Sequence, residues 1–460
     1  MSIARPATPL SRTEERAWRG AVTSGLRFAV PLDHARPHGE SIEIFARSVR
    51  ADEPGSERRP WLLYLQGGPG FPALRPQGGA SGWLATLLPR FRVLLLDQRG
   101  TGASTPLDTA VLSALGPAAA IVERLSHFRA PDIVADAEAV RLAMGIDRWS
   151  TLGQSYGGFI TLSYLSLAPT ALEACLVTGG LGEMRGDADL VYRATYARLR
   201  EREDEFLAAH PGDEERLALV YDVVRSRRAA GSPERLPDGS EVTETSVQRL
   251  GMFLGGNARV EGLHHALETA IVNVGGEPRL SASMLGTLQA QLDHAAHPLY
   301  WLLQESIYSS GRPTAWAAER VRRESFPEFL PSAPRPRLLG EMALPEDYET
   351  SVPLLPLRDA AHALAAHEGW GSLYDREVLA RNTVPVAAAV YTHDVYVDRE
   401  LSLASAAAVN GLRVWESAAH HHDGLADDPE TVLGALLALL DEETTGTASA
   451  PLSAGTPPAP

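Results

Sequence analysis

The sequence predicts an α/β fold, with a mostly parallel sheet in its core and an inserted helical cap. Short, continuously apolar segments such as residues 61–65 and 92–97 alternate with helical segments in the first part of the chain. Such runs are typical of parallel strands that are buried on both faces. The alternation stops near residue 180, gives way to helical patterns, and resumes near residue 384. We therefore predict a first part of the core (1–180), a helical cap (181–383), a second part of the core (384–442) and a disordered tail (443–460).

The individual elements follow from their periodicity. Residues 1–20 are polar and are expected to be loosely held. Two-residue alternation predicts an antiparallel hairpin from residues 26–32 and 41–49. The predicted core strands after it are 61–65, 92–97, 148–152, 172–178, 384–391 and 412–416. The predicted core helices are 133–141, 158–165, 399–410 and 429–440, and the clearest cap helices are 190–208, 260–274, 283–295 and 313–324.

The composition narrows the classes of function. The formal net charge of the 460 residues is -16, which argues against nucleic acid or an anionic membrane as the main partner. No run approaches the roughly 18 apolar residues of a membrane span. Cys175 is the single cysteine, so no intrachain disulfide can form. We expect a cytoplasmic protein in which Cys175 fills the core.

The stretch Gly153-Gln154-Ser155-Tyr156-Gly157 has the pattern G-x-S-x-G, which places a serine on a sharp turn between a strand and a helix. The apolar-leaning segment 148–152 before it and the segment 158–165 after it supply that context. Such a turn lifts the serine hydroxyl to the top of a sheet, beside a helix N-terminus that favours negative charge. We therefore predict that Ser155 is a catalytic nucleophile.

A second glycine-rich stretch, Gln66-Gly67-Gly68-Pro69-Gly70, leaves the predicted buried strand at 61–65. Glycines allow backbone N–H groups to turn toward an oxygen without obstruction by a Cβ atom. In this architecture one oxyanion donor comes from this loop and the other from the residue after the nucleophile. We predict the backbone amides of Gly68 and Tyr156 as the oxyanion hole, with Gly67 as a close alternative to Gly68.

A third stretch, residues 97–102, is interpreted as structural. It lacks the lysine of a phosphate-binding loop and the spacing of a dinucleotide fingerprint. We predict that it is a turn that braces the loop at 66–70, with Asp97 and Arg99 paired to each other.

The acid and the base are expected after the cap, in the order Ser, Asp, His. Asp394 follows the strand 384–391 and is the first choice for the acid, while Asp398 remains an alternative. The last strand runs into His420, His421 and His422, and spacing alone does not choose among them. Adjacent side chains diverge and rarely share one ion, so we predict no metal and no cofactor.

Together these segments resemble the prolyl aminopeptidases, also called proline iminopeptidases, in their longer form. The resemblance rests on four motifs: Gln66-Gly67-Gly68-Pro69-Gly70, Asp97-Gln98-Arg99-Gly100-Thr101-Gly102, Gly153-Gln154-Ser155-Tyr156-Gly157-Gly158 and His422-Asp423-Gly424. Gln66 stands where the family usually has His, a change that the longer members tolerate. The resemblance implies a serine peptidase of the α/β-hydrolase fold that removes N-terminal proline.

The resemblance also implies site residues. The family's base precedes Asp-Gly, which selects His422, and its acid matches Asp394. Family members hold the free amino group of the substrate with cap carboxylates, which implies Glu305 and Glu341 here. The expected partners are short peptides with N-terminal proline, while the oligomeric state stays open. The alternatives are an esterase, amidase or aminopeptidase of other specificity on the same scaffold, or a binding protein without catalysis.

Overall fold

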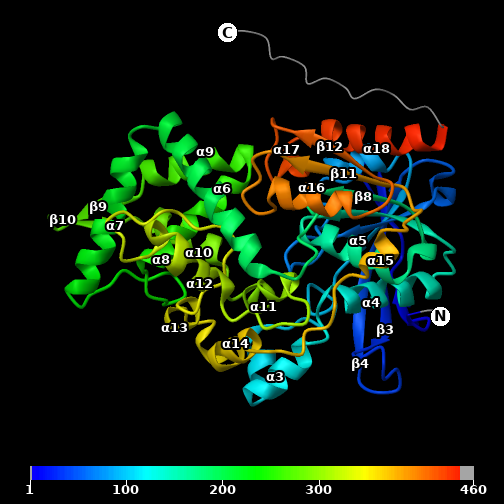
Figure 1. Cartoon of the computed structure of the whole chain (residues 1–460), viewed down its shortest axis with the longest axis horizontal. Coiled ribbons are helices and arrows are strands. Elements are labelled where there is room, and N and C mark those ends of the chain that lie inside the picture. The colour runs from blue at the N-terminus through cyan, green and yellow to red at the C-terminus, as the bar shows by residue number, and fades with distance from the viewer. Residues whose placement is uncertain (1–2, 446–460) are drawn as a thin grey trace, which may run out of the picture.

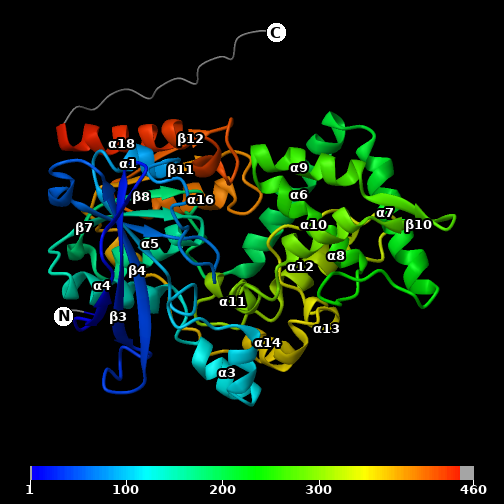
Figure 2. The same cartoon turned by 180° about the vertical axis from the view of Figure 1, so that it is seen from behind.

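A computed structural model describes residues 3–445 of the chain. It shows a sheet-containing core beside a helical region that is coloured green and yellow in Figure 1 and is seen from behind in Figure 2. The predicted boundaries of the cap, at residues 181 and 383, lie between strands of the core sheet. The predicted disordered tail begins too early, because residues 443–445 belong to helix α18 (Pro429–Thr445), and the rest of the predicted tail, residues 446–460, lies outside the described residues.

The core is built on one sheet in the order β1-β3-β4-β6-β5-β7-β8-β11-β12, with β2 pairing with β3. Pairing is antiparallel from β1 to β6 and parallel from β6 to β12. Of the parallel strands, β5, β6 and β11 are almost entirely buried, which explains their continuous apolar sequence, whereas the edge strand β12 is mostly half-buried. The strands are β1 (Thr8–Arg12), β2 (Arg16–Trp18), β3 (Ala21–Pro31), β4 (Ser41–Ala51), β5 (Trp61–Leu65), β6 (Arg92–Leu96), β7 (Trp149–Gln154), β8 (Leu172–Thr178), β11 (Val386–Tyr391) and β12 (Leu412–Ser417).

The N-terminal segment is more ordered than its sequence predicts. The predicted hairpin is confirmed as β3 and β4, which run antiparallel from Ala21 opposite Ala51 to Pro31 opposite Ser41. The expectation that residues 1–20 are loosely held is wrong, because β1 and β2 both pair with β3. Every side chain of β1 and β2 is exposed, so backbone hydrogen bonds rather than apolar burial hold these strands.

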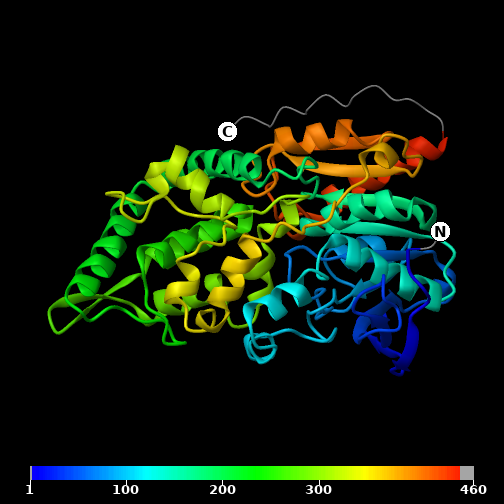
Figure 3. The same ribbon diagram turned by 60° about the horizontal axis from the view of Figure 1, so that its bottom comes forward.

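Helices cover both faces of the sheet (Figures 1 and 3). On one face, α1 and α18 pack over a cluster that includes Leu62, Leu95 and Leu433. On the other face, α4 and α5 pack over a larger cluster that includes Leu63 and Ile160. The core helices are α1 (Trp83–Leu87), α2 (Thr109–Ala114), α3 (Ala118–Leu125), α4 (Ala130–Ala143), α5 (Tyr156–Leu167), α15 (Arg376–Leu379), α16 (Arg399–Ala407), α17 (Gly424–Asp427) and α18 (Pro429–Thr445).

Between β8 and β11 the chain is mostly helical. The predicted helix at 260–274 is correct only in its first part, because residues 271–274 form strand β9, which pairs with β10 (Glu277–Leu280) across a glycine turn. Within the described residues, no helix is both long and apolar enough to traverse a lipid bilayer. Besides α15, which packs against α5 of the core, the helices of this segment are α6 (Ala188–Ala209), α7 (Asp213–Ala229), α8 (Glu244–Gln248), α9 (Asn257–Glu268), α10 (Ala282–Leu292), α11 (Pro298–Leu303), α12 (Ala317–Ser325), α13 (Asp347–Thr350) and α14 (Arg358–Ala365).

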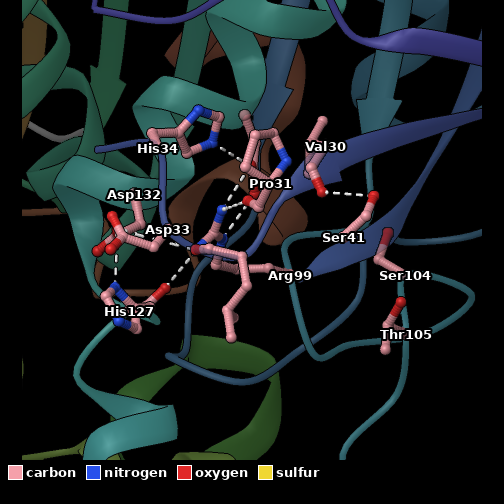
Figure 4. A network of polar contacts seen from close by, with 12 residues as sticks. Val30, Pro31, Asp33, His34, Ser41, Arg99, Ser104, Thr105, His127 and Asp132 are labelled. Atoms are coloured by element: carbon pink, nitrogen blue, oxygen red, sulfur yellow. Dashed lines mark hydrogen bonds and ion pairs between the residues drawn. The ribbon is translucent and has the colours of Figure 1, made fainter. Parts of the chain in front are cut away.

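The turn at residues 97–102 braces its neighbours, but not through the predicted pair. Arg99 is fully buried and binds Asp136 of α4 through two hydrogen bonds of 2.7 and 2.6 Å. Figure 4 shows its guanidinium beside Pro31 and His127, whose carbonyls it also contacts. Asp97 instead pairs with Arg75 at 2.7 Å. The predicted pair is therefore wrong, because the long Arg99 side chain reaches past its own turn to α4.

Candidate active site

Ser155 lies at the carboxyl end of β7, where the chain turns directly into α5. Its φ angle of 54° is unusual for a residue with a side chain and is typical of a strained functional turn. Glycines are required around it, since a Cβ atom on Gly157 would lie 1.9 Å from the carbonyl oxygen of Leu65. The backbone N–H of Ser155 donates to the carbonyl of Thr178 at 3.0 Å, which ties the turn to the end of β8.

The loop at 66–70 lies against this turn. A Cβ atom on Gly67 would be 3.0 Å from the Cβ atom of Ser155, so only glycine allows this approach. Gly68 has a φ angle of 128°, which a residue with a side chain rarely adopts. The Gln98 side chain donates to the carbonyl of Gln66 at 2.8 Å, so the turn at 97–102 does brace this loop. Tyr156 is the first residue of α5, and its N–H therefore has no acceptor within the helix.

Asp394 follows β11 and is almost fully buried, with 1% of its surface exposed. Its Oδ1 atom accepts hydrogen bonds from the backbone N–H groups of Tyr396 at 2.8 Å and Val397 at 3.0 Å. The alternative acid, Asp398, is bound elsewhere, because it accepts from two backbone N–H groups at the start of α16 and pairs with Arg198. The structure therefore distinguishes the two carboxylates by their partners.

The three adjacent histidines have three different partners. Nδ1 of His422 lies 2.8 Å from Oδ2 of Asp394. Nδ1 of His420 lies 2.7 Å from the Ser417 hydroxyl, and Nδ1 of His421 lies 3.2 Å from the carbonyl oxygen of His393. The three rings therefore do not converge on a common ligand, and only His422 is joined to Asp394.

Gly179 links the nucleophile to the acid–base pair. A Cβ atom at this position would lie 3.2 Å from Nδ1 of His422 and 3.4 Å from Oδ2 of Asp394. Gly179 directly follows Thr178, which accepts the hydrogen bond from the Ser155 N–H. The ends of β7, β8 and β11 therefore bring these side chains to one edge of the sheet, as is usual for sites in parallel sheets.

The electrostatics of His422 are dominated by acidic neighbours. Burial opposes the charged imidazolium, but the Asp394 carboxylate and, to a smaller extent, Glu341 and Asp423 raise the pKa of His422 to about 9. The ring of Tyr396 packs edge-on against His422, with 4.9 Å between centroids and an interplanar angle of 81°. His422 is therefore held tightly, in a site that favours a positive charge.

Glu341 reaches this site from the loop before α13. Burial raises its pKa to about 7, while the positive charges of His422 and Arg259 act in the opposite direction. Glu341 remains partly accessible to solvent, although protein atoms surround it. The side chains of Tyr300 and Tyr308 lie close to its carboxylate. A carboxylate that is largely enclosed, partly accessible and close to the Tyr300 side chain is suited to bind a small organic cation.

The structure brings Glu305 to a different place. Its Oε1 atom accepts a hydrogen bond of 2.9 Å from the backbone N–H of Ala318, at the start of α12. Oε2 is buried and has no hydrogen-bond partner within residues 3–445. Burial also raises the pKa of Glu305. This carboxylate stabilises the N-terminus of α12, and its role as an amino-group ligand stays a prediction.

Three residues of the site were not singled out by the sequence. Arg259 of α9 pairs with Asp423 at 2.5 Å, and the hydroxyl of Tyr396 donates to the carbonyl of Met252 at 2.9 Å. These contacts join the cap to the loops that carry Asp394 and His422. Asp423 and Tyr396 lie next to predicted residues, but no signal in the sequence points to Arg259.

One other cluster combines residue types that bind metals, within the part of the chain that the structure describes. His210, Asp213 and His264 of the cap have ligand atoms within 4.8 Å of one another. The two imidazole rings are stacked, however, with 4.3 Å between centroids and an interplanar angle of 22°. Their in-plane lone pairs do not meet, and Asp213 is already bound to His264 and Arg216.

Comparison with known proteins first gives the class. Residues 60–212 match the family model described as the alpha/beta hydrolase fold. This range contains the loop at 66–70 and Ser155, and the strand order and serine turn described above agree with that fold. The protein is an α/β hydrolase.

Relatives that match most of the chain give the family. A proline iminopeptidase from Aeromonas sobria is 42% identical over 421 residues, which are 90% of this chain and 95% of that protein. Proline iminopeptidase aneH from Aspergillus aculeatus is 31% identical over 433 residues, or 91% and 94% of the two chains. The chain belongs to the proline iminopeptidase family. The solved proline iminopeptidase from Mycobacterium smegmatis is 15% identical, with a TM-score of 0.43 over 91% of this chain and 99% of that one.

Proposed function

We propose that this protein is a serine exopeptidase that releases N-terminal proline from short peptides. The observation that carries the proposal is that the strained Ser155 turn and the His422–Asp394 pair lie at the same edge of the sheet. The cap carboxylate Glu341 beside this pair supplies a site for the substrate amine. The family, with its two full-length relatives named as proline iminopeptidases, supports this choice of substrate.

The proposed reaction is acyl transfer through a covalent intermediate. His422 takes the proton of the Ser155 hydroxyl as the oxygen attacks the prolyl carbonyl, and Asp394 holds the imidazole in the required tautomer. The backbone N–H groups of Gly68 and Tyr156 stabilise the tetrahedral oxyanion. His422 then gives its proton to the leaving amine. Water, activated by His422, attacks the prolyl ester of Ser155 and releases proline.

Substrate selection is assigned to the cap. The charged pyrrolidine nitrogen of an N-terminal proline pairs with Glu341, and the aromatic side chains of Tyr300 and Tyr308 lie beside it. A buried charged pair holds the amino end of the peptide at a fixed distance from Ser155, which limits cleavage to the first peptide bond. Glu305 is kept as a second candidate for this role.

In this proposal Glu341 also influences the pKa of the catalytic base, His422. Glu341 is one of the groups that raise the pKa of His422, and a cation bound to Glu341 reduces that influence. Binding of the substrate amine therefore lowers the pKa of His422 and increases the fraction of neutral imidazole. A substrate with a charged amino end therefore increases the fraction of His422 that can accept the proton of Ser155.

The test compares proline β-naphthylamide with simple acyl esters as substrates. The wild-type protein is expected to release naphthylamine, and Ser155→Ala is expected to lose this activity while it keeps its folded circular dichroism spectrum. Absence of turnover of the prolyl substrate, together with rapid hydrolysis of acyl esters, would contradict the proposal and favour an esterase on the same scaffold.

We also propose that the protein is located in the cytoplasm. Cys175 is fully buried in β8, and its burial raises the pKa of the thiol to about 12, so it is unreactive. A fold that needs no disulfide is compatible with a reducing cytoplasm. Detection of the protein in the cytosolic fraction of its host cells would test this assignment.

A further inference from the structure

The loop that carries Glu341 has no regular structure of its own. Residues 336–344 form neither helix nor strand, so no ladder of backbone hydrogen bonds holds them in place. Buried backbone polar groups nevertheless need hydrogen-bond partners, because leaving them unpaired costs free energy. Side chains from other parts of the cap supply several of these partners. The position of the Glu341 carboxylate therefore depends on the side chains that hold its loop.

Arg249 holds this loop on both sides of Glu341. It is fully buried and is the first residue of the short 3₁₀ helix Arg249–Gly255, which lies between α8 and α9 in the chain. Its Nη1 atom donates to the carbonyl oxygen of Gly340 at 3.3 Å and to that of Met342. These are the residues directly before and after Glu341, so one guanidinium fixes the backbone that carries the carboxylate.

The Arg249 guanidinium is itself held in one orientation. Its Nη2 atom donates to Oδ2 of Asp347 at 2.6 Å, and the same oxygen accepts the backbone N–H of Leu344 at 2.8 Å. The guanidinium also lies 4.9 Å from the ring centroid of Trp301. A planar guanidinium presents its N–H donors in a fixed geometry, which the ammonium group of lysine cannot reproduce. Arg249 is therefore suited to place a loop as well as to neutralise a charge.

Further contacts join the same parts of the cap. The side chain of Gln304 donates through Nε2 to the carbonyl oxygen of Glu341 itself, at 3.2 Å. The backbone N–H of Leu339 donates to the carbonyl of Gln248 at 2.8 Å. A Cβ atom on Gly251 would lie 2.4 Å from the carbonyl oxygen of Leu339, so the 3₁₀ helix and the loop are in direct contact.

The other end of the 3₁₀ helix contacts the loops that carry the proposed acid and base. The carbonyl of Met252 accepts a hydrogen bond of 2.9 Å from the hydroxyl of Tyr396. The carbonyl of Gly255 accepts one of 3.3 Å from the backbone N–H of Asp423. Residues 248–255 thus connect the loop of the cap carboxylate to both of these loops.

We propose that Arg249, assisted by Gln304, is a positioning residue that sets the distance between the Glu341 carboxylate and the His422–Asp394 pair. This inference rests on the proposed function, because the distance matters only if Glu341 holds the amino end of the substrate. With the amine held there, the first peptide bond reaches Ser155 and the next bond does not. Arg249 acts through the backbone on either side of Glu341, without contact with the substrate.

Steady-state hydrolysis of proline β-naphthylamide by Arg249→Lys tests this role. Lysine keeps a positive charge beside Asp347 but does not hold the loop carbonyls as a guanidinium does. We expect kcat/KM to fall by about tenfold or more, mainly through KM, as is usual when a positioning group is misplaced. Fluorophosphonate labelling of Ser155 is expected to continue, because this probe has no amine. A general folding defect would instead lower turnover and labelling in proportion, and that result would overturn the proposal.

Arg141→Lys is the matched control. Arg141 is also buried, and its Nε atom pairs with Glu138 at 2.7 Å. It donates to the carbonyls of Ile146 and Asp147, both at 2.6 Å, just before β7 begins. Its contacts are therefore of the same kinds, but they lie at the opposite end of β7 from Ser155. We expect a loss of stability in Arg141→Lys, with kcat/KM within about twofold of the wild-type value.

The double variant Arg249→Lys/Glu341→Gln shows whether Arg249 acts through Glu341. If it does, Arg249→Lys costs nothing further once the carboxylate is gone, and kcat/KM stays within about twofold of that of Glu341→Gln. A further loss of about tenfold in the double variant would overturn the proposal, because independent effects multiply. An unchanged kcat/KM in Arg249→Lys alone would overturn it as well.

Gln304→Met protects the test from a folding defect at position 249. It removes the donor to the Glu341 carbonyl without introducing a charge, and we expect kcat/KM to fall by about two- to fivefold while labelling of Ser155 is preserved. Where Arg249→Lys does not fold, an unchanged kcat/KM in Gln304→Met overturns the proposal. Absence of prolyl turnover by the wild type, with labelling of Ser155 intact, would refute the proposed function itself and this role with it.

Discussion

The core and the cap each supply a carboxylate to the site, and the two carboxylates differ in how they are held. Asp394 of the core accepts two backbone hydrogen bonds and lies 2.8 Å from His422. Glu341 of the cap receives no backbone hydrogen bond within the described residues, and its pKa is raised to about 7. The core thus provides a fixed anion, whereas in our proposal the anion of the cap is left to pair with the substrate amine. On that proposal, the core carboxylate serves the chemistry and the cap carboxylate serves the choice of substrate.

The largest expected effect in this comparison comes from Asp394→Asn. An amide in this position favours the wrong imidazole tautomer, so kcat is expected to fall by about 10⁴-fold. Steady-state hydrolysis of proline β-naphthylamide measures it. Asp398→Asn is the matched control: it keeps a capping side chain at the start of α16 but removes the ion pair with Arg198, and it is expected to cost at most about 1 kcal/mol of stability with little change in kcat. Equal losses of kcat in the two variants would contradict the assignment of the acid.

The second-largest effect is expected from Glu341→Gln, which distinguishes the role of Glu341 from that of Glu305, the other cap carboxylate. Glu341→Gln removes the charge that binds the substrate amine, so kcat/KM for the prolyl substrate is expected to fall by about 10- to 100-fold, the value of one charged hydrogen bond. Labelling of Ser155 by a fluorophosphonate, which has no amine, is expected to continue.

Glu305→Gln is the counterpart of that variant. It removes the negative charge of the carboxylate at the start of α12, and we expect a loss of about 1 kcal/mol in the free energy of unfolding. The change in kcat/KM is expected to be smaller than that in Glu341→Gln. Chemical denaturation and steady-state kinetics measure the two quantities. A larger loss of kcat/KM in Glu305→Gln than in Glu341→Gln would reverse our assignment of the amino-group ligand.

The pH dependence of labelling tests the coupling between the two regions. The folded-state pKa of His422 is raised to about 9, so neutral imidazole is lost as the pH falls below that value. The rate of fluorophosphonate labelling is therefore expected to rise with pH up to about 9. Glu341→Gln removes a negative charge near the imidazolium, and the midpoint is expected to move down by about 1 pH unit. An unchanged midpoint would show that the cap carboxylate does not act on the base.

The smallest effect is expected from Tyr396→Phe. This variant keeps the ring that packs on His422 but removes the hydroxyl that donates to the carbonyl of Met252. We expect a loss of about 1 kcal/mol in the free energy of unfolding, the usual value of a buried hydrogen bond, with kcat within about threefold of the wild type. A large loss of kcat would show that the cap contact positions the base.

The sequence predicts the core well because its strands are buried on both faces and are therefore continuously apolar. It misses β1 and β2 for the opposite reason: their side chains are all exposed, so no apolar pattern marks them. The helix predicted over 260–274 extends too far, since the apolar residues at 271–274 fit a strand as well as a helix. The partner of Arg99 was missed because a side chain of this length can reach another element.

The same reasons limit what the sequence says about the site. Ser155 and the loop at 66–70 are marked by local glycine patterns that a sharp turn requires. The sequence without the resemblance does not decide whether Asp394 or Asp398 is the catalytic acid. The two carboxylates differ in the backbone N–H groups that bind them, and only the folded chain brings these groups together. Arg259 joins the site from α9, and only the fold of the cap brings it there.

The anchoring of the cap has a consequence for how a peptide enters. Four contacts tie residues 252–259 to the two loops that carry Asp394 and His422: Tyr396 to Met252, Asp423 to Gly255, Asn257 to Ala419 and Arg259 to Asp423. Lifting the cap on this side would pull on the loops that orient the imidazole. We therefore expect peptide and product to pass on another side of the cap, while these contacts beside His422 are kept.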